Sequence, residues 1–161
     1  MGSEMCIRDS EVFVRINGEL HYLWRAVDHE GEVLEAFVTK KRDREAAVRF
    51  LKKAMKRYGR PKAIVSDGLA SYPAAMREIG NEACQETGQW HNNRAENSHQ
   101  PFRRREQAMA GFRSPATLQK FASTHSSIHN HFNQDRHLNR RDSFKQKRAA
   151  ALSEWRQLCA A

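Results

Sequence analysis

The chain has 161 residues, with 28 Lys and Arg against 19 Asp and Glu, which gives a formal net charge of +9. This length suits one domain with a real core, and no apolar run approaches the roughly 18 residues that cross a bilayer, so a membrane-spanning protein is excluded. The N-terminus lacks an apolar secretory segment, and three widely spaced cysteines argue against a disulfide framework or a zinc site. We therefore expect a cytoplasmic protein with free thiols.

The first ten residues, MGSEMCIRDS, show neither a strand period nor a helix period, and a clear pattern begins only at Glu11. The segment resembles a translated sequencing-adapter remnant more than a natural lead-in. Residues 1–10 are therefore predicted to be a non-native segment and are set aside before the fold is considered. The sheet is expected to begin at Val12.

Three strands are predicted next. Val12, Val14 and Ile16 alternate with other residues, and Asn17-Gly18 is a strong signal for a tight hairpin. Two further strands follow over 22–28 and 33–39, so the three strands form an antiparallel meander.

The period then becomes helical, and the remaining elements are taken in chain order. The predicted elements are a helix capped by Asp43 and ended by Gly59, a strand over 63–65, a helix over about 70–79, a weak strand near 83–89, a basic helix after Asn92-Asn93 with a kink or restart at Pro101, and helices over about 115–131 and 143–159. This order predicts an α/β fold, a mixed sheet covered by helices. The strand that ends near Asp67 is expected beside the strand that begins at Val12.

The excess positive charge lies in the last two-fifths of the chain. Residues 97–161 carry 12 Lys and Arg against 4 Asp and Glu, a net charge of +8, whereas residues 1–96 have a net charge of +1. Clustered charge of this kind favours a polyanionic partner, most often nucleic acid. A basic face that only keeps the protein soluble is the alternative.

Two acidic residues are candidates for chemistry. Asp67 follows a buried strand, where α/β sheets usually place ligands, although Ser66-Asp67-Gly68 is also an ordinary turn. Glu96 lies three residues after an asparagine that could cap its helix, so a capping role is the alternative. If the fold brings the two carboxylates together, they would bind Mg²⁺, and a pair of such ions promotes phosphoryl transfer.

Basic residues and histidines complete the set of candidates. Arg103, Arg104 and Arg105 are consecutive on a helix, so at least one faces outward to bind phosphate. The further basic residues that could follow a nucleic-acid backbone are Lys120, Arg136, Arg140, Arg141, Lys145, Lys147 and Arg148. Three histidines, His125, His129 and His131, lack further zinc ligands nearby and are expected to be structural or surface groups.

Three motifs in order carry a resemblance to a known family. The stretches EVFVRINGELHYLWRAVDHEGEVLEAFVTKKRD, IVSDGLASY and NNRAENSHQPFRRRE, with the tail HNHFNQDRHLNRRDSFKQKRAAALSEWRQL, resemble the catalytic core of bacterial transposases of the insertion sequence six family. The resemblance covers about 150 positions, from Glu11 onward. It implies a DDE transposase with an RNase H-like (integrase catalytic core) fold and a basic helical C-terminal extension.

The resemblance also implies the reaction and its residues. Three carboxylates hold two Mg²⁺ ions (Mn²⁺ is an alternative) that cleave DNA at element ends and join the 3′-OH to a target. The second acid corresponds to Asp67 and the third to Glu96. The partners are element ends and target DNA, bound by a homodimer or higher oligomer in the bacterial cytoplasm, at the nucleoid. The expected DNA-binding residues are Asn93, Arg94, Arg103, Arg104, Arg105, Arg140, Arg141, Lys145, Lys147 and Arg148.

The first acid departs from the family pattern. It should immediately precede the Glu-Val-Phe-Val stretch, but Ser10 stands there and Asp9 lies one residue further back. A shift of one residue along a strand points a side chain to the other face, so we infer that the native aspartate has been replaced and that catalysis is crippled. Nothing before Glu11 could form the family's helix-turn-helix, so recognition of element ends is not expected.

The resulting division of the chain has three parts: residues 1–10 as the non-native segment, 11–110 as the catalytic core, and 111–161 as the basic helical part. Three other functions stay open. These are a non-catalytic nucleic-acid-binding fragment that keeps the fold, a small basic RNA-associated protein, and a standalone RNase H-like nuclease. The paired Asp67 and Glu96 count against the RNA-associated protein, and the incomplete acid triad counts against the nuclease.

Overall fold

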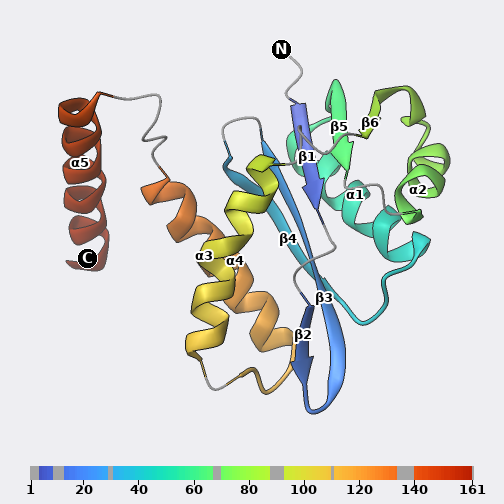
Figure 1. Ribbon diagram of the computed structural model, residues 1–161, viewed down its shortest axis with the longest axis horizontal. Coiled ribbons are helices and arrows are strands. Elements are labelled where there is room, and N and C mark those ends of the chain that lie inside the picture. Colours follow the sequence, from blue (N-terminus) through green and yellow to red (C-terminus); the bar gives the residue numbers. More distant parts are fainter. Residues whose placement is uncertain are drawn as a thin grey trace.

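A computed structural model describes the backbone of residues 4–8, 13–28, 31–66, 70–87, 93–109, 111–133 and 140–160 (Figure 1). The side chains of residues 4–8, 87 and 93–98 lie outside the described set. The elements in these ranges are β1 (Glu4–Arg8), β2 (Phe13–Ile16), β3 (Glu19–Asp28), β4 (Val33–Thr39), α1 (Arg44–Tyr58), β5 (Ala63–Ser66), α2 (Ser71–Ile79), a 3₁₀ turn (Glu82–Cys84), β6 (Gln85–Thr87), α3 (Asn93–Ala108), α4 (Pro115–Phe132) and α5 (Arg141–Ala160).

The strands form one mixed sheet in the order β2-β3-β1-β5-β6, and β4 pairs with the other side of β3. Strand β3 is antiparallel to β1, β2 and β4, whereas β5 is parallel to β1 and β6 is parallel to β5. Helices α1 and α2 lie on one side of the sheet, and α3 and α4 lie on the other (Figure 1). The predicted α/β class, a mixed sheet with flanking helices, is confirmed.

The hairpin between β2 and β3 forms where the sequence predicts it. Asn17 and Gly18 both have positive φ, at 51° and 82°. Asparagine and glycine tolerate this left-handed conformation better than other residues. The turn matches the right-handed twist of its two strands, which is why Asn-Gly is such a strong hairpin signal.

Helix α1 likewise has the ends that the sequence predicts. The Asp43 side chain accepts a hydrogen bond from the Ala46 N–H at 2.9 Å, and Gly59 ends the helix with φ of 81°. The apolar side of α1 is fully buried against β3 and α2, in a cluster that includes Trp24, Phe50 and Tyr72. Capping and periodicity therefore act together to orient this helix on the sheet.

The prediction that the sheet begins at Val12 is wrong. Residues Glu4–Arg8, which lie inside the segment set aside as non-native, form β1, and β1 lies between β3 and β5. The strand that precedes Asp67, β5, is therefore beside β1 rather than beside β2. The ten residues of β3 are long enough to pair with β2 over Glu19–Tyr22 and with β1 over Arg25–Asp28. The residues of β1 show no apolar alternation. They form a strand because their backbone groups pair with β3 and β5, and the sequence pattern does not reveal this pairing.

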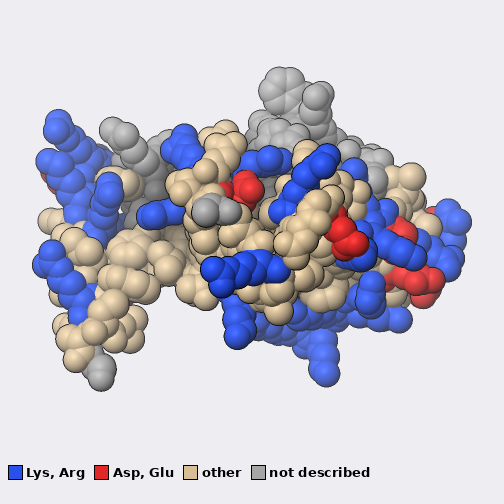
Figure 2. All heavy atoms as spheres, turned by 90° about the horizontal axis from the view of Figure 1, so that it is seen from below, with Lys and Arg blue, Asp and Glu red and all other residues tan. Residues whose placement is uncertain are grey.

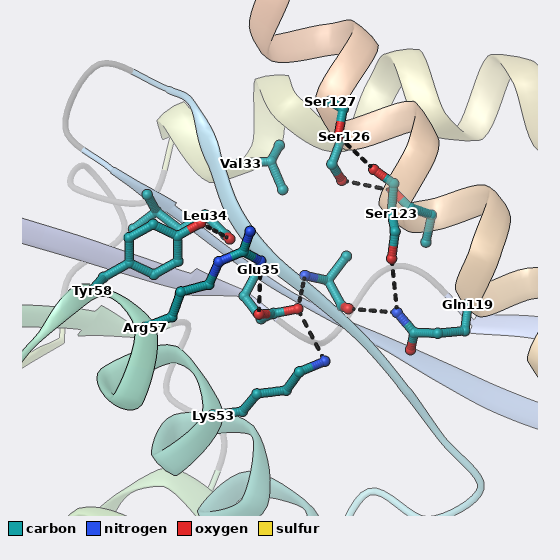
Figure 3. A network of polar contacts seen from close by, with 12 residues as sticks. Val33, Leu34, Glu35, Lys53, Arg57, Tyr58, Gln119, Ser123, Ser126 and Ser127 are labelled. Atoms are coloured by element: carbon teal, nitrogen blue, oxygen red, sulfur yellow. Dashed lines mark hydrogen bonds and ion pairs between the residues drawn. The ribbon is translucent and has the colours of Figure 1, made fainter.

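Helix α4 covers the open edge of β4 with amide side chains. Gln119 accepts a hydrogen bond from the Val38 N–H at 2.9 Å and donates one to the Ala36 carbonyl at 2.8 Å. Asn130 does the same for both backbone groups of Val33, at 2.7 and 2.8 Å. Figure 3 shows Gln119 on one side of the strand, and on the other side Tyr58, which donates to the Leu34 carbonyl at 2.7 Å. An edge strand whose backbone groups are occupied in this way resists pairing with another chain.

A buried carboxylate ties β4 to α1. Glu35 is only 7% exposed, and Lys53 lies 3.2 Å and Arg57 3.9 Å from its oxygens (Figure 3). The Glu35 carboxylate also accepts a hydrogen bond from the Ala36 N–H. These partners satisfy a charge that would otherwise be costly to bury.

The three C-terminal helices are confirmed. Of the two outcomes expected at Pro101, a restart is wrong, because α3 runs through this residue as one helix. Ser114 caps α4 by accepting from the Thr117 N–H at 3.2 Å. Leu118 and Ala122 of α4 pack in the same cluster as Leu23 of β3. The division of the chain at residue 110 stays a prediction of the sequence. Helix α5 stands at one end of the molecule (Figure 1) and contacts α4 through Trp155 against the His131 and Phe132 rings.

No helix in the described part of the chain is long and apolar enough to cross a membrane. Cys84 and Cys159 are free thiols, as expected.

Candidate functional site

Neither of the two candidate acids has a described side chain. Asp67 directly follows β5 in the sequence but lies outside the described residues. Glu96 lies on α3, which packs against β1 and β3, and its side chain lies outside the described set. Because β1 and β5 are parallel and Ile7 pairs with Ser66, the two strands end together. The distance between the two carboxylates stays a prediction.

A buried arginine anchors α3 to the sheet beside these elements. Arg25 of β3 is 1% exposed, and its Nη1 donates to Nδ1 of His99 at 3.3 Å. Its guanidinium also lies 5.8 Å from the centre of the Phe102 ring, a cation–π contact. Burial lowers the pKa of Arg25 to about 10, so the group remains a cation at neutral pH.

Arg25 also lies where the registers of β1 and β2 against β3 differ. Four residues separate Arg8 from Phe13, but only two separate their partners Arg25 and Tyr22, so β1 is offset by two residues from the register of β2. If the pairing of β2 with β3 continued toward the N-terminus without this offset, residue 10 would lie opposite Arg25. In this chain Arg8 holds that register position. Asp9 and Ser10 lie outside the described residues.

The donor set does not fit the two-ion group that the resemblance implies. Two carboxylates, Asp67 and Glu96, are available in the sequence, but the register position opposite Arg25 carries Arg8 instead of an acid. Arg25 itself is a buried cation on the side of the sheet that α3 covers. Two divalent cations need more negative charge than these residues supply.

The histidines of α4 pack against aromatic rings and against each other. The His125 ring lies edge-on to Phe102 at 5.5 Å, and His129 stacks on His125 at 6.4 Å with an interplanar angle of 10°. Burial, followed by the positive charges of Arg25, His129 and Arg105, lowers the pKa of His125 to about 4. Burial and the charge of Arg25 also lower the pKa of His129. Both rings are therefore neutral at pH 7.

The lowered pKa of His125 predicts acid sensitivity. Between the ordinary histidine pKa, near 6.5, and about 4, the unfolded chain binds a proton at this site that the folded chain does not. The stabilisation that the neutral His125 ring contributes is therefore fully present above pH 6.5 and is lost as the pH falls to about 4. Because the ring is only half buried, we expect this site to contribute roughly 1–2 kcal/mol.

Urea unfolding at pH 7 and at pH 4.5 measures this contribution. The loss of unfolding free energy between the two pH values should be smaller in His125→Gln than in the unmodified chain. Equal losses in the two chains would contradict the assignment, whatever the stability of the variant at pH 7.

The expected DNA-binding residues lie in two places, on α3 and on or directly before α5. Arg104 and Arg105 on α3 and the basic residues of α5 are exposed, whereas Arg103 is half-buried over the Phe13 ring, 5.5 Å from its centre. Figure 2 shows basic side chains over much of one face, including the end where α5 lies. The exposed residues on α5 or directly before it are Arg140, Arg141, Lys145, Lys147 and Arg148. Asn93 and Arg94 begin α3, and their side chains lie outside the described set.

Sequence reasoning missed Arg25 and His99. Arg25 interrupts the apolar run Leu23-Trp24-Arg25-Ala26-Val27, and alternation alone places it on the side of β3 opposite Trp24. In an isolated sheet that side could face water, but α3 covers it. A charged residue inside such a run is the one signal that could have revealed it.

Comparisons with known proteins agree with these features. Residues 5–135 match the DDE domain of IS240-type transposases. The transposase of the insertion sequence-like element IS431mec from Staphylococcus aureus (strain N315) is 32% identical over 97 residues, 57% of this chain and 43% of that protein. The transposase of IS257 in transposon Tn4003, also from Staphylococcus aureus, gives the same values. The chain thus spans less than half the length of these curated relatives.

Among solved structures, the catalytic core domain of HTLV-2 integrase in complex with magnesium (dimeric form) has a TM-score of 0.46 and 14% identity, over 60% of this chain and 68% of that chain. The BIV integrase core has a TM-score of 0.46 and 15% identity, over 76% and 97%. The DDE domain match runs from β1 to just beyond α4, which includes the mixed sheet and the helices on both of its faces. The chain belongs to the DDE transposases of the insertion sequence six family.

Proposed function

We propose that this chain is the core of an insertion-sequence transposase that binds DNA, with a strand-transfer site that is incomplete. The family reaction is metal-dependent cleavage at element ends followed by joining of the 3′-OH to a target. The observation that carries the proposal is the DDE domain match over residues 5–135, in a chain whose α3 and α5 expose arginines and lysines. DNA is the partner that suits such basic helices.

Asp67 and Glu96 are the proposed acids of the site. Oxygen ligands of this kind take Mg²⁺ or Mn²⁺, and two such ions would supply charge neutralisation at the attacking and leaving oxygens. The position of the first acid is the weak point, since Arg8 is opposite Arg25. We infer that the chain binds at most one ion and does not cleave DNA.

The family resemblance supplies the remaining parts of the proposal. The family acts on element ends and target DNA. This chain would bind DNA without recognising element ends, as a homodimer or higher oligomer in the bacterial cytoplasm, at the nucleoid. The proposed DNA-binding residues include Asn93 and Arg94 at the start of α3 and the exposed basic residues of α5.

A two-residue deletion tests the incomplete site directly. Removing Arg8 and Ser10 leaves Asp9 immediately before Glu11, as in the family pattern, and removes the two-residue offset between β1 and β2. The register of β2 would then bring Asp9 opposite Arg25. We expect this variant to nick supercoiled plasmid in Mg²⁺ or Mn²⁺ about 100-fold faster than the unmodified chain, the size of effect that a charge-stabilising group contributes.

A matched deletion isolates the carboxylate. Removing Arg8 and Asp9 shortens the chain equally and resets the same register, but leaves Ser10 before Glu11. This control should remain inactive, and Glu96→Ala should abolish any activity gained by the first variant. Robust cleavage by the unmodified chain, lost in Glu96→Ala, would show that the first carboxylate lies elsewhere.

A non-catalytic DNA-binding fragment is the second candidate function, and one observation favours it: Arg8 holds the register position opposite Arg25. The two candidates differ in the deletion experiment. If the variant with Asp9 before Glu11 binds DNA but never cleaves it, the second candidate is correct.

A further inference from the structure

A pocket opens between α3 and α4. Its volume is about 680 Å³, within the range of small-molecule sites. Helix α3 contributes Arg104 and Arg105, and α4 contributes His125, Ile128 and His129 among others. None of the described lining residues is one of the proposed acids.

The inner surface of the pocket is apolar and aromatic. The rings of His125 and His129 lie nearly parallel in it, and the low pKa of His125 leaves that ring uncharged at pH 7. Phe121 packs on His125 at 5.7 Å, and Ile128 remains 37% exposed at the pocket. An exposed isoleucine beside flat, neutral rings offers a surface for a planar group.

The side of the pocket formed by α3 is positively charged. Arg104 and Arg105 are exposed and form no ion pair with the described residues. The described lining includes no acidic side chain, while Thr124 and Asn133 add hydrogen-bonding groups. A flat apolar surface beside two guanidinium groups matches a nucleotide, in which a planar base is joined to a phosphate.

We propose that this pocket holds one unpaired nucleotide of DNA, with its base against the histidine and isoleucine surface and its phosphate at Arg104 and Arg105. The proposal rests on the proposed DNA-binding function and adds a preference for DNA that carries an unpaired end or flap. A base inside a duplex is stacked and paired, and enters a protein pocket only after leaving the stack.

Fluorescence anisotropy with labelled duplexes tests this preference. One duplex is blunt, a second carries a short unpaired 3′ tail, and a third carries a tail of the same length made of abasic sites. The unmodified chain should bind the tailed duplex about tenfold more tightly than the blunt one, because stacking of a single base on a protein surface has this magnitude. The abasic tail should not give the gain.

Two pairs of variants locate the effect. Ile128→Glu and Ser127→Glu each add one negative charge at an exposed position of α4, but only Ile128 lines the pocket. Likewise, Arg104→Ala and Arg49→Ala each remove one positive charge from an exposed position, but only Arg104 lines the pocket, because Arg49 lies on α1. The tenfold preference should be lost in Ile128→Glu and reduced in Arg104→Ala, and it should persist in both controls.

The outcomes separate the two proposals. If no duplex binds even at low salt, the DNA-binding function itself fails. If the blunt duplex binds but the tail gives no gain, or if the abasic tail gives the same gain, the pocket does not hold a base. Dissociation of a self-associated chain by Ile128→Glu, with the tail preference unchanged, would instead identify the pocket as a contact between copies of this chain.

Discussion

DNA binding by this chain is expected to weaken about 500-fold when the salt concentration rises from about 50 mM to about 200 mM. Exposed arginines and lysines on α3 and α5 would displace the counterions that surround DNA. If about five phosphates are neutralised, log K falls with log[salt] at a slope near −4.5, since each phosphate contributes about −0.9. Anisotropy of a labelled duplex over a range of salt concentrations measures the slope.

Two triple variants assign this slope to one side of the molecule. Changing Arg103, Arg104 and Arg105 to alanine should make the slope shallower by about one for each phosphate that the variant no longer neutralises. The control removes three exposed basic residues of α1, on the opposite side of the sheet: Arg49, Lys52 and Lys56. This control should keep the slope of the unmodified chain. Binding that is insensitive to salt, or equal slopes in the two variants, would contradict binding through the C-terminal helices.

Trp24→Ala is expected to lower the free energy of unfolding by about 3–5 kcal/mol, the usual cost of removing a large core aromatic residue. Trp24 is fully buried at the centre of the cluster between β3, α1 and α2. Its ring lies 5.9 Å from Phe50 and 5.8 Å from Tyr72, and its Nε1–H donates to the Thr39 hydroxyl at 2.7 Å. The substitution removes the ring contacts and the hydrogen bond together.

Two further variants separate these contributions in urea unfolding followed by circular dichroism. Trp24→Phe keeps most of the apolar volume but loses the hydrogen bond, so the loss should be about 1–2 kcal/mol. Trp155→Ala, which removes a half-buried ring of α5, should cost less than about 1 kcal/mol. A loss in Trp24→Ala no larger than in Trp155→Ala would show that the cluster around Trp24 is not the main core.

Several elements could be predicted from the sequence because local interactions form them. The Asn17-Gly18 turn, the Asp43 cap and the Gly59 terminus each depend on residues within a few positions of one another. Backbone conformation and side-chain hydrogen bonds at this range are encoded by the residue types themselves. The predicted helices and most of the predicted strands were therefore found close to their expected bounds.

The central strand shows where this reasoning stops. Glu4–Arg8 has no apolar alternation, and it becomes a strand because β3 and β5 offer backbone partners on both sides. The partner of β5 was misidentified for the same reason, since two separate segments share one side of β3. Pairing between segments distant in the sequence depends on register, which residue patterns specify poorly in a short strand.

Some features of the candidate site could likewise be predicted from the sequence, and others depend on tertiary structure. The sequence alone determined the family motifs, the choice of Asp67 and Glu96 as candidate acids, and the concentration of positive charge after residue 97, because these are properties of residue types and their order. Only the tertiary structure decided that Arg8 pairs opposite Arg25, that Arg25 is buried beneath α3, and that two histidines and two arginines share a pocket. Burial and proximity arise when distant segments pack together, so they set the charge and chemistry of a site that the order of residues does not contain.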